Sequence, residues 1–252
     1  MARLPRLYAP ALPQLVQATF AVPLAAPGQP VPAELLDELA GWLGETASRQ
    51  HVALHGWVLT HDRVVLLATP GDEEGLPRLM QTLGRNLAAR LRRGRVFAGR
   101  YRSALVEPGS WVLSALVWLE TLPQRAGLAH DPESWRWSSA AAHTGAASAP
   151  AAWLSDHADY WACGNTPFDR QANYRARLQE GLSREQAERI ERTLSGQWAL
   201  GGSRFIDSLA HTASRRVTPG KRGRPRKQQP AADAAAPGTA PAVPDGEPAQ
   251  PA

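Results

Sequence analysis

The segment from residue 75 to residue 106 contains eight arginines and no acidic residue. Arginine binds phosphate groups through paired hydrogen bonds, whereas a helix face that only meets water usually carries charges of both signs. A run of one sign therefore favours contact with a nucleic acid over a merely solvated surface. The eight residues are Arg78, Arg85, Arg90, Arg92, Arg93, Arg95, Arg100 and Arg102.

A second basic segment lies at residues 221–227, and its Gly-Arg-Pro core resembles an AT-hook. In such a segment proline keeps the backbone extended, and arginines enter the narrow minor groove of A·T-rich DNA. The alternative is a generic basic tail that binds any polyanion. The candidate DNA contacts here are Lys221, Arg222, Arg224, Arg226 and Lys227.

Few residues have the types and spacing of a metal site or a covalent nucleophile. Cys163 is the single cysteine, so neither a disulfide within the chain nor a multi-cysteine zinc site can form. Turn polarity accounts for His61 and Asp62 better than metal ligation does. Tyr101, between two arginines, is better explained by packing or phosphate contact than by nucleophilic attack.

Hydrophobic periodicity predicts the elements that position these residues. Apolar, β-branched runs predict strands over residues 12–22, 51–59, 63–69 and 95–107. Apolar stripes at helical spacing predict helices over residues 32–50 and 75–93. The order β-α-β-β-α-β is that of an α+β, ferredoxin-like antiparallel sheet with helices on one face. Arg78, Arg85 and Arg92 would share one stripe of the second helix.

The C-terminal half is predicted to be helical, and its end is predicted to be disordered. Further helices are predicted over residues 110–122, where Pro123 ends the helix, and over residues 167–180, 184–195 and 203–211. Ser183 and Gln186 form a capping-box pattern. Composition divides the chain into a core domain (1–145), a helical extension (146–214), the basic segment (215–229) and an Ala/Pro-rich disordered tail (230–252).

The composition is that of a globular domain, and its modest positive charge favours a polyanionic partner, although such an excess is also common in soluble proteins. The 252 residues are 43% hydrophobic, and the formal net charge is +5. No signal peptide and no apolar run long enough to cross a membrane is recognisable. We therefore expect a cytoplasmic, nucleoid-associated protein without membrane contact.

Seven short motifs together resemble the REP-associated tyrosine transposases, relatives of the single-tyrosine transposases of bacterial insertion sequences. Their order and spacing agree over residues 1–143, and Gln124-Arg125-Ala126-Gly127 falls where the family has part of an Asn-Pro-Val-Arg-Ala-Gly segment. The motifs are residues 1–7, 64–70, 79–85, 99–103, 122–128, 131–132 and 137–139.

The resemblance implies DNA strand transfer through a 5′-phosphotyrosine. In the family two histidines, one hydrophobic residue apart on a strand, hold Mg²⁺ or Mn²⁺, and a helix tyrosine attacks the phosphate. Here those positions fall on Arg63, Val65 and Trp118, and no His-x-His pair occurs in the chain. Arginine repels a cation, and neither valine nor indole can replace the missing groups. We therefore expect no bound metal or other cofactor and an inactive enzyme.

These observations predict a transposase-like protein that binds hairpin or single-stranded repeat DNA without cleaving it, with the tail adding an A·T-rich duplex contact. Two alternatives stay open: an active transposase with a relocated nucleophile, and an RNA-binding module. Monomers and dimers both stay open as well. The expected DNA contacts outside the tail are Arg78, Arg85, Arg92, Arg93, Arg100, Arg102 and Arg125.

Deleting residues 221–227 should weaken binding to A·T-rich duplex and flatten its salt dependence, because each phosphate that is no longer neutralised removes about 0.9 from the log–log slope. Binding to an isolated hairpin should change less. Fluorescence anisotropy over a salt series measures both effects. An unchanged slope for the duplex would show that the tail does not contact it.

Overall fold

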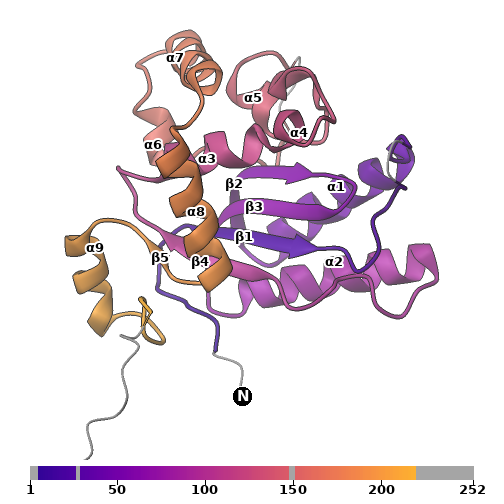
Figure 1. The fold of residues 1–252 in the computed structure, drawn as a ribbon, viewed down its shortest axis with the longest axis horizontal. Coiled ribbons are helices and arrows are strands. Elements are labelled where there is room, and N and C mark those ends of the chain that lie inside the picture. The colour runs from indigo at the N-terminus through magenta and orange to yellow at the C-terminus, as the bar shows by residue number, and fades with distance from the viewer. Residues whose placement is uncertain (1–4, 27–28, 148–150, 220–252) are drawn as a thin grey trace, which may run out of the picture. The chain divides into compact units, whose positions relative to one another are not determined.

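The chain is described by a computed structural model over residues 5–26, 29–147 and 151–219. At its centre lies one sheet with the strand order β2-β3-β1-β4-β5 (Figure 1). The first four strands pair antiparallel in the ferredoxin-like order, which confirms the predicted fold class. The strands are β1 (Gln14–Thr19), β2 (Val52–Leu59), β3 (Arg63–Pro70), β4 (Arg102–Val106) and β5 (Ala199–Leu200).

Helices α1 (Ala33–Arg49) and α2 (Gly75–Leu91) pack against each other behind the sheet (Figure 1). Both have the apolar stripe that the sequence predicts. In α2 every residue of that stripe is buried, so the opposite side of the helix faces solvent. The buried stripe of α2 consists of Leu76, Leu79, Met80, Leu83 and Leu87.

Helices α1 and α2 lie on one face, as the ferredoxin-like order predicts, and later helices cover the other face, the front. Helix α3 (Val112–Glu120) packs on β2 and β3, and α8 (Arg184–Gly196) packs on β1 and β4 (Figure 1). The physical reason lies in α3 itself, where eight of the nine residues are buried. A helix that is apolar all round must be enclosed by protein.

Most local predictions in the C-terminal half hold. Helix α7 (Pro167–Glu180) has the predicted bounds, and Ser183 and Gln186 form the predicted capping box of α8. Pro123 does not end a helical segment but lies in the first turn of α4, where its missing N–H costs no hydrogen bond. The remaining helices are α4 (Leu122–Arg125), η1 (Pro132–Ser134), α5 (Ala140–His143), α6 (Ala158–Trp161), α9 (Ser203–Ser208) and η2 (Leu209–His211).

The predicted strand over residues 95–107 is shorter than expected, because β4 begins only at Arg102. Between α2 and β4 the chain makes an isolated bridge from Phe97 to Phe20. The guanidinium of Arg95 donates hydrogen bonds to the carbonyl oxygens of Phe97 and Ala98, which fixes this loop in an irregular shape. The loop matters below because it forms one wall of a cavity.

From residue 220 onward, the predicted basic segment (215–229) and the predicted tail (230–252) lie outside the described residues. The predicted domain boundaries stay predictions. Within the described ranges, no helix has both the length and the apolar character that crossing a membrane requires.

A buried carboxylate joins α3 to α5 and α7. The Glu120 side chain is fully buried, and its Oε1 accepts hydrogen bonds from Ser139 Oγ at 2.5 Å and His143 Nδ1 at 2.6 Å. Its Oε2 accepts one from the Tyr174 hydroxyl at 2.7 Å. Burial raises the pKa of Tyr174 well above its ordinary value, and the nearby Glu120 carboxylate adds to the effect, so the hydroxyl keeps its proton.

Replacing Tyr174→Phe should lower the free energy of unfolding by about 1–3 kcal/mol, because it leaves a buried carboxylate oxygen without a donor. Urea denaturation at neutral pH measures the change. Tyr8→Phe is the matched control, since the Tyr8 side chain is only partly buried and its hydroxyl makes no hydrogen bond to any described residue. Equal losses in both variants would contradict this account of Glu120.

Candidate nucleic-acid interface

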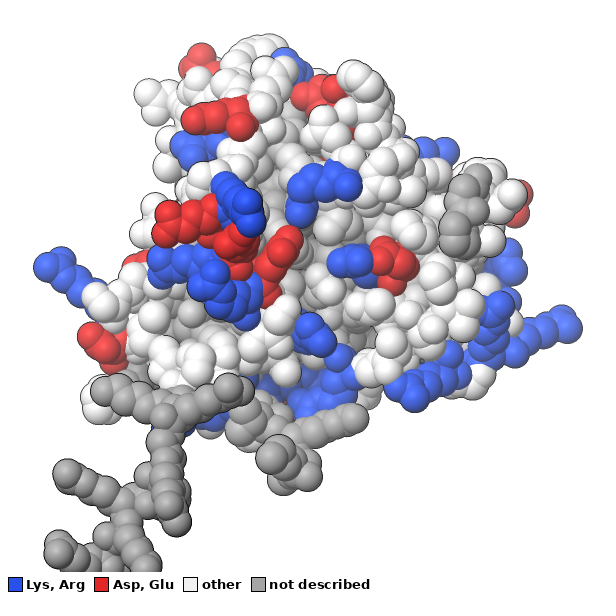
Figure 2. Space-filling model, viewed as in Figure 1, with Lys and Arg blue, Asp and Glu red and all other residues white. Residues whose placement is uncertain are grey.

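Arginines gather on the solvent side of α2 and on the loop that follows it. All eight arginines between residues 75 and 106 are exposed. In Figure 2 basic side chains line the lower right margin of the molecule, where Figure 1 shows α2. We call five of these residues, all candidates from the sequence, the α2 arginine surface. They are Arg78, Arg85, Arg92, Arg93 and Arg100.

Little negative charge neutralises this surface. Arg78 makes a long ion pair with Asp72, at 3.8 Å, and Arg90 a close one with Glu38, at 2.6 Å. Within the described ranges, Arg85, Arg92 and Arg93 have no carboxylate within 4.0 Å. Closely spaced arginines without a carboxylate partner attract phosphate groups more strongly than arginines that are already in an ion pair.

The predicted stripe of three arginines is interrupted at its end. Arg78 and Arg85 lie on α2, but α2 ends at Leu91 and Arg92 is its C-cap residue. The φ of Arg92 is 51°, in the left-handed region, so the chain turns at this residue. Arg92 and Arg93 therefore extend the basic surface around the end of the helix and do not continue the line of the stripe.

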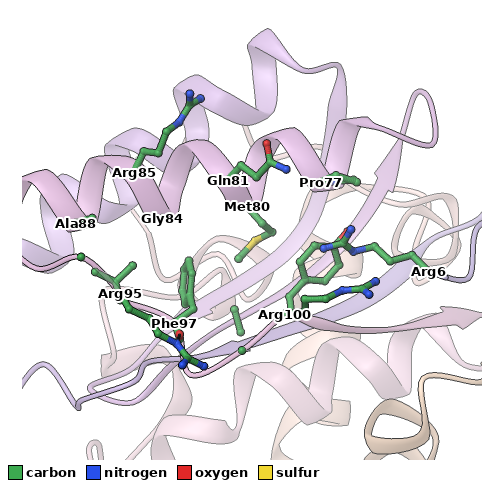
Figure 3. A pocket seen from close by; sticks show the side chains of 15 residues that line it. Arg6, Pro77, Met80, Gln81, Gly84, Arg85, Ala88, Arg95, Phe97 and Arg100 are labelled. Carbon is green, nitrogen blue, oxygen red and sulfur yellow. Dashed lines mark hydrogen bonds between the residues drawn. The ribbon is translucent and has the colours of Figure 1, made fainter. Parts of the chain in front are cut away.

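A cavity of about 540 Å³ opens beside this surface, between α2 and the loop of residues 94–101 (Figure 3). Arg85, Arg95 and Arg100 contribute to its lining, and Arg6 reaches it from the N-terminal segment. Sequence reasoning missed Arg6, because nothing near residue 6 indicates that it returns to α2. The contact arises from tertiary structure alone.

Arg6 lies on the ring of Tyr101, with its guanidinium carbon 4.3 Å from the ring centroid. Tyr101 is 6% exposed, and burial raises the pKa of its hydroxyl to about 12. At neutral pH this phenol therefore keeps its proton and is held under a cation. That environment fits a packing residue of the cavity wall better than it fits a nucleophile.

Two predicted DNA contacts do not join the α2 arginine surface. Arg102 pairs with Gln17, which also pairs with Val65, so Arg102 points to the front face of the sheet. Arg125 lies on α4 at the front, where it donates a hydrogen bond to the Trp118 carbonyl at 2.5 Å. Its guanidinium also stacks on the Trp118 ring and lies 3.6 Å from Glu191.

The three positions that the motif alignment predicts for the family's metal ligands and tyrosine also lie at the front. Arg63 and Val65 are two apart on β3 and share the face covered by α3, which carries Trp118. The Arg63 guanidinium is paired with Asp62 at 2.5 Å, and Val65 is fully buried. The indole N–H of Trp118 is buried and has no acceptor among the described residues.

A divalent cation does not fit these residues. An arginine, a valine and a tryptophan supply no ligand oxygen or imidazole, and the nearby Asp62 already neutralises Arg63. In the part of the chain that the structure describes, no three His, Cys, Asp or Glu side chains gather closely enough to hold a metal.

His55 on β2 has the chemistry of a metal ligand, but both of its ring nitrogens already have hydrogen-bond partners. His55 contacts the Ser155 carbonyl through Nδ1 at 2.7 Å and the Thr69 hydroxyl through Nε2 at 2.8 Å. Burial lowers the pKa of His55 to about 4, so the ring is neutral at physiological pH. Both ring nitrogens are used in packing β2 against its neighbours, which is a structural role.

Comparisons with known proteins identify a similar fold. No protein-family model matches the chain, and no curated protein matches it. A solved structure of a REP-associated tyrosine transposase bound to a REP hairpin superimposes with a TM-score of 0.50 at 11% identity. The match covers 63% of this chain and 96% of the other. At this identity the likeness shows a shared fold.

Introducing Arg63→His together with Val65→His should create Mn²⁺ binding, because both imidazoles would lie on the same face of β3. Isothermal titration calorimetry on the double variant, on Arg63→His alone and on the parent measures the effect. We expect binding at least tenfold tighter in the double variant than in the single one, since two ligands chelate where one does not. Equal binding in parent and double variant would mean that a metal site exists elsewhere.

Proposed function

We propose that this protein binds DNA containing a hairpin or a single-stranded repeat, and that it does not cut that DNA. The observation that carries the proposal is the α2 arginine surface, whose guanidinium groups are exposed and largely without acidic partners. Such a surface neutralises backbone phosphates, which supply most of the affinity in protein–DNA complexes.

The kind of DNA is suggested by the structural neighbour. That protein is a transposase and its structure contains a REP hairpin, and it shares this fold along almost its whole length. Together with the motifs that resemble REP-associated tyrosine transposases, this favours a folded strand as the ligand. The basic segment at residues 221–227 would add a second, minor-groove contact to adjacent duplex on the bacterial nucleoid.

We propose that the DNA is not cut because of the residue types at the three positions that align with the family's catalytic residues. Phosphoryl transfer to a tyrosine needs a phenol beside the phosphate and a group that stabilises the leaving oxygen. The corresponding positions hold Trp118, Arg63 and Val65, and the first two are engaged in contacts with Arg125 and Asp62. DNA that bound there would meet side chains able to hold a phosphate but unable to attack it.

The test begins with a pool of DNA hairpins that have randomised loops and flanks, from which the tightest binder is selected. A triple variant, Arg85→Gln/Arg92→Gln/Arg93→Gln, should then bind that hairpin more weakly, with a salt slope lower by about 0.9 for each phosphate that it no longer neutralises. The matched control removes the same charge from α7 and α8 through Arg177→Gln/Arg184→Gln/Arg192→Gln. Equally weakened binding in both variants would show that only net charge matters.

The same hairpin, labelled and incubated with Mg²⁺ or Mn²⁺, should give no covalent adduct on a denaturing gel. Appearance of an adduct would overturn the non-cleaving part of the proposal while leaving DNA binding intact. Loss of that adduct in Tyr101→Phe would then identify a relocated nucleophile.

A further inference from the structure

The cavity beside α2 has the size and lining of a pocket for a small aromatic group. Its volume of about 540 Å³ lies within the range of roughly 300–1,000 Å³ that is usual for sites holding small organic ligands. Its inner walls are apolar, with Met80 on the α2 side and Val96, Phe97 and Tyr101 on the loop before β4.

One wall is a rigid aromatic surface. The Phe97 ring stacks on the Phe20 ring with centroids 5.7 Å apart and an angle of 13° between the planes, so its position is fixed from behind. Figure 3 shows Met80 reaching from α2 into the space between Phe97 on one side and Arg6 and Arg100 on the other. A thioether and a fixed aromatic ring together form a surface on which a flat ring can stack.

The rim of the same cavity is strongly basic. Arg6 and Arg100 lie at one end (Figure 3), and Arg85 and Arg95 add positive charge along the rim. The Nε of Arg6 is buried and has no hydrogen-bond partner among the described residues. Gln81 adds an exposed side-chain amide, which can both donate and accept hydrogen bonds.

An apolar slot with a cationic end matches the chemistry of one nucleotide. We infer that the cavity takes a single unpaired nucleotide of the bound DNA, with its base between Met80 and Phe97 and its phosphate against Arg6 and Arg100. This inference rests on the proposed function. A base that is paired and stacked in a duplex cannot enter, so the cavity would select DNA with an unpaired position.

An abasic scan of the selected hairpin tests the inference. Each unpaired nucleotide is replaced in turn by an abasic residue, which removes the base and keeps the phosphate. At one position the affinity of the unaltered protein should fall about tenfold, because stacking of one base on an aromatic ring contributes about that much. The other positions should change little.

A variant that fills the cavity should abolish this response. Gly99 lines the cavity, and a Cβ added there meets no atom within 4 Å, so Gly99→Leu introduces bulk without changing charge. Gly41→Leu is the control, since Gly41 is an exposed glycine of α1 with equally open surroundings. We expect Gly99→Leu to bind the intact and the abasic hairpin equally, and Gly41→Leu to behave like the parent.

Each outcome bears on one claim. If no abasic position weakens binding, or if Gly99→Leu keeps the full response, the cavity does not hold a base, although DNA binding through the α2 arginine surface stands. Tighter binding of an RNA copy of the hairpin would overturn the assignment to DNA. Failure of the parent to bind any hairpin would overturn the proposed function itself. Should Gly99→Leu unfold in a melting experiment, the abasic scan with the parent decides alone.

Discussion

The position of β1 between β3 and β4 is the constraint on which the rest of the structure depends. Because β1 is paired on both sides, its register decides the face on which residues of three strands emerge. Ala18 points back to the cavity beside α2, while its neighbour Gln17 points to the front with Val65 and Arg102. The arginines near α2 and the arginines at the front thus lie on opposite sides of the sheet. The sequence alone did not distinguish these two groups.

The two groups differ in whether their arginines already have partners within the protein. At the front, Arg63 is held by Asp62, and Arg125 is held by the Trp118 carbonyl, the Trp118 ring and Glu191. These guanidinium groups are held by contacts within the protein. Behind the sheet, Arg85, Arg92 and Arg93 are exposed and have no carboxylate within 4.0 Å among the described residues. Exposed arginines therefore lie behind the sheet, whereas the arginines at the front are held by contacts within the protein.

The sequence was sufficient wherever a short-range pattern decides the structure. The first four strands, the leucine stripe of α2, the bounds of α7 and the cap of α8 all follow from spacing within a few residues. Contacts between distant segments were not predictable in this way. The return of Arg6 to Tyr101, the pairing of β5 with β4 and the enclosure of α3 each depend on where other elements lie. The basic surface of α2 could therefore be predicted in outline, but the cavity beside it could not.

The outer edges of the four antiparallel strands, on β2 and β4, are covered by residues that come late in the chain. Strand β5 pairs with β4 through only two residues, and β2 is met at its outer edge by bridges from Leu54 to Leu154 and from Val58 to Ser138. An uncovered strand edge is a template for pairing with another chain. Residues 138–200 are synthesised after β2 and β4, so a nascent chain that has folded these strands but has not reached those residues would have both edges unpaired. Open strand edges favour association between chains, so the late segments would also protect the protein against aggregation.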